Sequence, residues 1–137
     1  MLFKNTHKIT LLAVLLFSMT VQAQVNFDEI EIEVLKVRDN IFMLVGSGGN
    51  ITVQVGDEGV LIIDTQYAQL SDKVLAKIRE LSDMPLRYII NTHHHGDHIG
   101  GNANLRAAGF TPSGGNVGGD LGDAGEGARI LAHENVL

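Results

Sequence analysis

Three histidines and one carboxylate stand within six positions of this chain, at His93, His95, Asp97 and His98, in the pattern His-x-His-x-Asp-His. Imidazole nitrogen and carboxylate oxygen are ligands that suit zinc above all, with iron, manganese and copper also possible. A histidine tag would be terminal and would carry no interleaved aspartate. The pattern therefore predicts a metal site.

The segments on either side of these residues predict how they are held. Residues 86–90 are mostly apolar and are expected to form a strand, and a glycine-rich segment follows the histidines. Alternate side chains of an extended segment share one side, so His93 and His95 should face one point. Asp97 and His98 follow a glycine turn and can face a second point nearby. This arrangement suits two metals about 3.5–4 Å apart.

The motif and its flanks resemble the signature of the metallo-β-lactamase superfamily of metallohydrolases. The resemblance extends over nearly all of the chain after its N-terminal region. It implies an α+β fold, the four-layer αβ/βα sandwich, of which this chain would supply only the N-terminal half. Two runs carry the resemblance. The motif itself lies in Tyr88-Ile89-Ile90-Asn91-Thr92-His93-His94-His95-Gly96-Asp97-His98-Ile99-Gly100-Gly101-Asn102. The second run, Val60-Leu61-Ile62-Ile63-Asp64-Thr65, looks like the family's strand ending in a buried aspartate.

The resemblance also implies roles for the four residues. His93 and His95 would hold a first Zn²⁺, and Asp97 and His98 a second. Zinc lowers the pKa of bound water to about 7, so a hydroxide could attack a lactam, a thioester or another ester of a small-molecule substrate. Asp97 is expected to be the catalytic residue that orients this nucleophile. The superfamily's di-iron oxidoreductases tend to have glutamate where His95 stands, so this histidine favours zinc hydrolysis.

The sequence assigns less specific roles to the other polar residues near the motif and to His133. His94 points away in an extended register and is expected not to be a ligand. Asp64 is either an anchor that hydrogen-bonds the metal loop or an ordinary strand-end aspartate. His133 resembles a family segment that is not usually a ligand, although a metal-binding role stays open. The family takes its remaining ligands from segments well downstream of the motif. We therefore expect the N-terminal part of a longer enzyme, the alternative being a truncated, catalytically inactive exported metal-binding fragment.

Residues 1–23 have the pattern of a secretory signal peptide. Lys4 and Lys8 give a positive start, and an apolar run too short to span a bilayer follows. Val21-Gln22-Ala23 offers small residues for cleavage after Ala23. A buried N-terminal helix or a membrane anchor is the alternative. The prediction is a periplasmic or secreted protein without stable membrane association after processing, with residues 24–137 as the metallo-β-lactamase-like domain.

Composition narrows the possible partners. The chain of 137 residues is large enough for one domain at most. It has no cysteine, which excludes both a disulfide and a cysteine metal ligand within the sequence. The net charge is −6, and cleavage would remove two lysines but no acidic residue. The mature chain would be more acidic still, so nucleic acid is disfavoured as a partner.

The hydrophobic pattern predicts four strands, a helix, a strand, the metal loop, a short helix and a last strand. The first strand is expected from the alternation of Ile30, Ile32 and Val34, and Ser71 is expected to cap the first helix. The glycine-rich segment 111–127 is expected to be a loop. It lacks the Lys-Ser/Thr ending of a phosphate-binding loop. The other expected elements are strands at 41–45, 51–55, 60–63, 86–90 and 128–132, and helices at 70–81 and 102–108.

Overall fold

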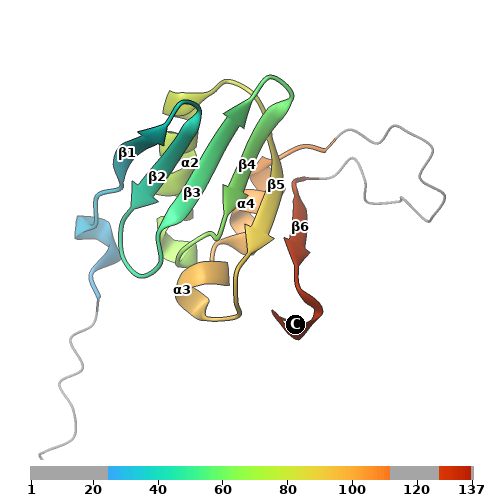
Figure 1. Cartoon of the computed structure of the whole chain (residues 1–137). Coiled ribbons are helices and arrows are strands. Elements are labelled where there is room, and N and C mark those ends of the chain that lie inside the picture. The colour runs from blue at the N-terminus through green and yellow to red at the C-terminus, as the bar shows by residue number, and fades with distance from the viewer. Residues whose placement is uncertain (1–24, 112–126, 137) are drawn as a thin grey trace, which may run out of the picture.

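The computed structural model describes residues 25–111 and 127–136. These residues form one six-stranded sheet with the strand order β1-β2-β3-β4-β5-β6 and helices packed on one of its faces (Figure 1). Neighbouring strands from β1 to β4 are antiparallel, whereas β4, β5 and β6 are parallel. The antiparallel start followed by alternating units confirms the expected α+β class. The predicted signal peptide lies outside the described residues, as does the glycine-rich segment at 112–126.

The bounds of the elements agree closely with the hydrophobic pattern. The strands are β1 (Glu33–Arg38), β2 (Ile41–Val45), β3 (Ile51–Gly56), β4 (Gly59–Ile63), β5 (Leu86–Asn91) and β6 (Arg129–Ala132), the α-helices are α2 (Ser71–Leu81), α3 (Gly96–Ile99) and α4 (Asn102–Ala108), and the 3-10 helices are η1 (Phe27–Glu29), η2 (Ala68–Leu70) and η3 (Glu134–Val136).

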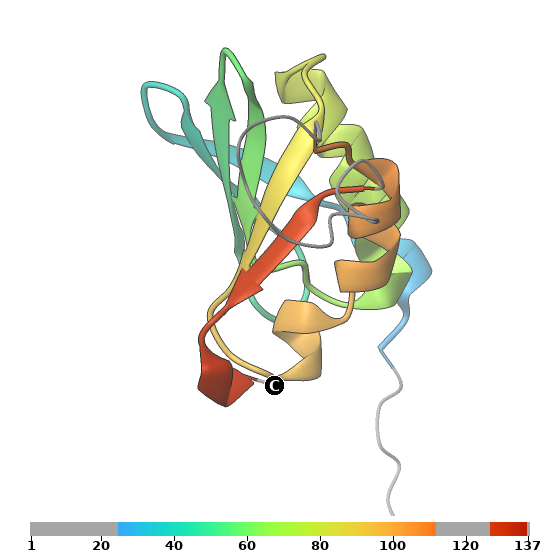
Figure 2. The ribbon, with the colours of Figure 1, turned by 90° about the vertical axis from the view of Figure 1, so that its right-hand side faces the viewer.

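The core lies between the sheet and helices α2 and α4, which Figure 2 shows side by side along one face. Side chains that alternate along the central strands enter it, among them Leu44, Val53, Ile62 and Ile89, each fully buried. Burial of such side chains stabilises the fold by about 1.5–3 kcal/mol each. This packing holds the carboxyl ends of β4 and β5 at a fixed spacing, and the chain segments that follow them form the site.

The opposite face of the sheet is also apolar. Strand pairing lines up one residue from each strand across this face, and the row is Leu35, Met43, Thr52, Ile63, Ile90 and Leu131. Leu35 and Leu131 at its two ends are 45% and 49% exposed. Within the described parts of the chain, no helix or strand covers this open row (Figure 2). One half of a two-half sandwich has an apolar face of this kind, because each sheet of a sandwich buries one face against the other half.

The first strand begins later than its alternation predicted. Ile30 and Ile32 precede β1, because the carbonyl groups of this segment bind a side chain instead of a neighbouring strand. The Lys73 ammonium of α2 donates to the carbonyl oxygens of Phe27, Asp28 and Ile30 at 3.3, 2.8 and 2.7 Å. Ile32 is buried in the core cluster. The alternating apolar residues therefore belong in part to the segment that leads into β1, and not to the strand itself.

The prediction that Ser71 caps the first helix is wrong. The backbone is already helical at Leu70, because η2 runs directly into α2, and Ser71 is the first residue of the α-helix. Its hydroxyl oxygen accepts a hydrogen bond from the Asn104 amide of α4 at 3.2 Å. Ser71 therefore joins two helices, and the sequence separation of these partners hid the contact.

Candidate metal centre

The predicted metal residues occupy the carboxyl end of β5 and the short helix α3 that follows it. An extended loop leaves the strand at Thr92 and reaches His95, whose carbonyl oxygen accepts from the backbone N–H groups of His98 and Ile99 at 2.9 and 3.1 Å. A helical turn thus stands where the sequence predicted a glycine turn. It lies below the ends of β4 and β5 in Figure 1. His93 precedes this turn, whereas Asp97 and His98 belong to it.

Asp64 anchors this loop from the end of β4. Its carboxylate is buried and accepts from the backbone N–H of Thr92 at 2.8 Å and from the Thr92 hydroxyl at 2.7 Å. The Nδ1 atom of His98 lies 2.7 Å from the same carboxylate. The two alternatives for Asp64 are thereby resolved, because the side chain binds both ends of the metal loop.

Two residues after β4 adopt the left-handed backbone region. The φ angles of Asp64 and Gln66 are 64° and 54°, and such a residue costs about 1–3 kcal/mol unless its surroundings hold it. Hydrogen bonds provide that hold. The Thr65 N–H donates to the His98 carbonyl oxygen at 2.7 Å, and the Gly101 N–H donates to the Gln66 carbonyl oxygen at 3.0 Å. The strained segment is thus fastened to the C-terminal end of α3 and the residues that follow it.

A pair of asparagine amides fixes the other side of the loop. The Asn91 amide donates to Asn102 Oδ1 at 3.1 Å, and the Asn102 amide donates to Asn91 Oδ1 at 2.8 Å. The pair closes the loop between the end of β5 and the start of α4. Sequence reasoning gave neither residue a role. The sequence did contain an indication of this contact, because one asparagine precedes the histidine motif and another follows it.

The structure brings the four predicted ligands close together. The ring centre of His93 lies 4.7 Å from that of His95 and 3.9 Å from that of His98. The Nε2 atom of His98 lies 3.5 Å from Asp97 Oδ2. The rings contact one another, however, and the part of the chain that the structure describes contains no group of three or more side chains placed to hold a metal ion. The ligand assignment stays a prediction.

The hydrogen bonds around two of these rings favour metal binding. An ionised Asp64 can only accept, so the Thr92 hydroxyl and His98 Nδ1 must donate to it. The Thr92 oxygen is then free to accept from His93 Nδ1, which lies 3.0 Å away. Both rings would carry their proton on Nδ1 and leave Nε2 unprotonated. A carboxylate or hydroxyl that fixes the tautomer in this way is the usual support of a metal-binding histidine.

The other candidate histidines lie outside this arrangement. His94 is exposed, as expected of a residue that points away, although its ring centre is 5.0 Å from that of His95. His133 follows β6 at the same end of the sheet, is exposed, and accepts from the Asn135 N–H through Nδ1 at 3.2 Å. Nothing in these contacts joins His133 to the other histidines.

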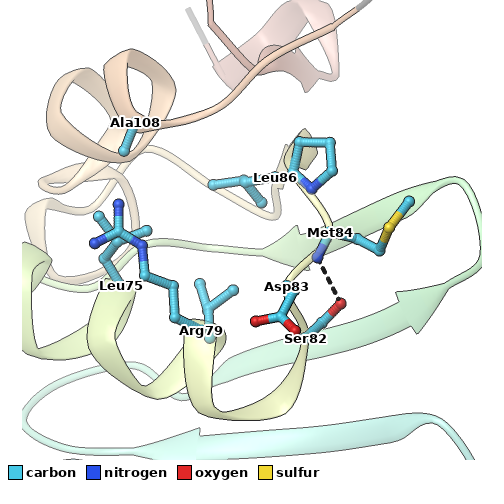
Figure 3. A pocket seen from close by; sticks show the side chains of 9 residues that line it. Leu75, Arg79, Ser82, Asp83, Met84, Leu86 and Ala108 are labelled. Atoms are coloured by element: carbon cyan, nitrogen blue, oxygen red, sulfur yellow. Dashed lines mark hydrogen bonds between the residues drawn. The ribbon is translucent and has the colours of Figure 1, made fainter.

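A hollow of about 290 Å³ lies at the other end of β5. It is formed where α2 ends and β5 begins, with Leu75, Arg79, Met84, Leu86 and Ala108 among its lining (Figure 3). The Met84 N–H donates to Ser82 Oγ at 3.1 Å across its rim. Because β5 separates this hollow from the histidines, it is not part of the candidate metal centre.

Fold and motif together define a class of protein. The family model of the metallo-β-lactamase superfamily matches residues 44–129, which is more than half of the chain. The chain therefore belongs to the metallo-β-lactamase superfamily, and the resemblance inferred from the motif is confirmed.

The curated relatives of this chain differ in the activities that their names give. The linear primary-alkylsulfatase of a Pseudomonas species is 49% identical over 45 residues, which is 32% of this chain and 8% of the relative. The hydroxyacylglutathione hydrolase of Pelagibacter ubique is 35% identical over 78 residues, which is 56% of this chain and 28% of the relative. The chain thus spans less than a third of the length of these curated relatives.

Solved structures agree on the fold. A B3 metallo-β-lactamase with an active-site glutamic acid superposes with a TM-score of 0.56 at 23% identity, covering 75% of this chain and 33% of that chain. At this identity the likeness shows the fold alone. The match to a third of a larger structure agrees with the prediction that these residues supply part of the sandwich.

Proposed function

We propose that this chain is the metal-binding part of a zinc-dependent hydrolase. His93 and His95 would hold one Zn²⁺, and Asp97 and His98 a second. The observation that carries the proposal is the hydrogen-bond chain from Asp64 to His98 Nδ1 and, through the Thr92 hydroxyl, to His93 Nδ1. This chain favours a proton on Nδ1 of both rings, which would leave their Nε2 atoms to bind metal. Bound zinc would polarise the substrate and supply a nucleophile at neutral pH.

The residues of this chain would position that chemistry. Asp64 and Thr92 orient the two rings, and the asparagine pair holds the loop ends. Asp97 stands at the start of α3, 3.5 Å from His98 Nε2, where its carboxylate could both bind metal and orient the attacking group. A metal site that is held by hydrogen bonds to rigid elements keeps its geometry during turnover.

The substrate class we propose is a lactam, a thioester or another ester, and relatives of this chain add sulfate esters to it. Their names include a linear primary-alkylsulfatase and a hydroxyacylglutathione hydrolase. The sulfatase match has the higher identity, which favours an alkyl sulfate ester as the first substrate to test. The alternative to an enzyme is an exported fragment that binds metal without turnover.

A hydrolysis assay separates these proposals. The wild-type protein and its Asp97→Ala variant would be loaded with zinc and offered an alkyl sulfate, a glutathione thioester and a chromogenic lactam. An enzyme should turn over at least one of them, and a chelator or Asp97→Ala should abolish the reaction. Turnover that neither change affects would refute the proposal. Zinc binding without any turnover would favour the non-catalytic alternative.

We also propose that residues 1–23 are a signal peptide and that the protein is exported. The charged start, the apolar run and Val21-Gln22-Ala23 support this. Within the described residues, no helix is both long and apolar enough to cross a membrane. N-terminal sequencing of protein from a periplasmic extract should begin at Gln24. An intact Met1, or protein that stays in the membrane after an alkaline wash, would exclude cleavage.

A further inference from the structure

The loop between β2 and β3 lies directly against the candidate metal centre. It contains the run Gly46-Ser47-Gly48-Gly49-Asn50. At Gly49 a Cβ atom would lie 2.4 Å from Cε1, 2.6 Å from Nε2 and 2.8 Å from Nδ1 of His98. Real Cβ atoms essentially never approach so closely. The Gly49 backbone therefore packs on the imidazole ring of His98, and only glycine fits between the loop and the ring.

The preceding glycine makes the same kind of contact with the neighbouring ligand. A Cβ atom at Gly48 would lie 2.5 Å from Cβ of Asp97 and 2.9 Å from the Tyr67 ring. Gly48 also has a φ of 81°, a conformation that other residues rarely adopt. The two glycines thus contact Asp97 and His98, the two residues assigned to the second metal.

His98 is consequently held on two sides. The Asp64 carboxylate binds its Nδ1 atom at 2.7 Å, and the Gly49 backbone packs against its ring. The hydrogen bond restrains the torsion of the ring at one nitrogen, and packing against the ring restrains it further. Together the two contacts fix the direction in which Nε2 points.

We propose that Gly48 and Gly49 are positioning residues for the second metal, acting through Asp97 and His98. A side chain at Gly49 would push the His98 ring off the loop and away from Asp64. The effect on metal binding rests on the proposed metallohydrolase function. The contact between Gly49 and the His98 ring can be tested without metal.

Gly49→Ala is the cleanest variant for this test. The φ angle of Gly49 lies outside the left-handed region, so alanine suits its backbone and only the contact with His98 opposes it. Gly96→Ala is the matched control. Gly96 adjoins Asp97 in the same motif, but nothing lies within 4 Å of the position its Cβ would take.

The first readout is the imidazole NMR spectrum of the metal-free protein. In the wild type and in Gly96→Ala, the His98 ring should show the Nδ1–H tautomer bound to Asp64. In Gly49→Ala this signal should be lost or averaged. An unchanged His98 tautomer in Gly49→Ala would overturn the proposal.

The second readout is cobalt titration followed by electronic spectroscopy. Gly49→Ala should weaken the ion held by Asp97 and His98 by about 10- to 100-fold, as loss of supporting contacts around a metal does, while the ion at His93 and His95 keeps its spectrum. Equal weakening in Gly96→Ala would contradict the assignment. A wild-type protein that takes up no cobalt would refute the proposed function, and the tautomer measurement would still decide the role of Gly49.

A third measurement covers the case in which Gly49→Ala folds poorly. His98→Ala removes the ring that the new methyl group would meet. In that background Gly49→Ala should leave the melting temperature unchanged, although it lowers that of the wild type. If Gly49→Ala is equally harmful with and without the ring, the contact with His98 is not the reason for the glycine.

Discussion

At the scale of single residues, the site is organised around one buried carboxylate. Asp64 accepts three hydrogen bonds, from the Thr92 N–H, the Thr92 hydroxyl and His98 Nδ1. All three donors belong to the loop that carries the histidines. The backbone strain at Asp64 is tolerated because these bonds, together with those of Thr65, hold the segment in place. The carboxylate thus couples the end of one strand to the loop after the next.

Asp64→Asn tests this coupling. An asparagine amide would turn a donor toward the Thr92 hydroxyl and His98 Nδ1, the two groups that donate to an ionised Asp64 in the wild type. Leaving a buried group of this kind unsatisfied should lower the free energy of unfolding by about 2 kcal/mol. Urea denaturation measures the change. Asp57→Asn, in the exposed turn between β3 and β4, is the matched control and should have no effect. Equal stability of the two variants would argue against the anchor.

At the scale of elements, local patterns were predicted well and long-range contacts were not. The apolar runs gave the strands, because burial on one face alternates along the chain. The histidine motif lies within six positions, so its residues could be assigned to one loop from the sequence. The contacts of Lys73 with the segment before β1 span more than forty residues. A local pattern of charge or hydropathy does not show which distant residues will pair. The sequence therefore predicted a start of β1 that is too early.

Lys73→Met tests how the N-terminal segment is held. The ammonium group donates to three carbonyl oxygens near η1, and its loss should open this segment at a cost of about 2 kcal/mol. Amide hydrogen exchange at residues 27–32 should accelerate. Lys77→Met is the control, since among the described residues Lys77 pairs with Glu80 of its own helix, at 2.9 Å. Unchanged exchange in Lys73→Met would show that packing alone holds the segment.

At the scale of the whole molecule, the described residues form a sheet with one covered face and one apolar face. The open row from Leu35 to Leu131 crosses every strand. The resemblance predicted half of a sandwich, and the strand register shows which side chains form the face that is left open. The solved structure that this chain matches is larger, and the match covers 33% of it.

The open row predicts that this chain binds a hydrophobic dye. The double variant Ile63→Thr with Ile90→Thr should reduce dye fluorescence, because both side chains lie at the centre of the row. Phe110→Ser removes a side chain that is 49% exposed but lies outside the row, and should change little. Equal dye binding by the wild type and the double variant would contradict an accessible row.

The zinc content of the purified protein tests the assignment of the metal centre most directly. Wild-type protein, His94→Ala and the double variant His95→Ala with Asp97→Ala would be loaded with zinc, dialysed together and analysed for metal. Because His94 is exposed and is not an expected ligand, its variant should retain as much zinc as the wild type. The double variant should lose the metal, since it lacks one ligand from each proposed site. Equal zinc content in all three proteins would contradict the assignment of the metal centre.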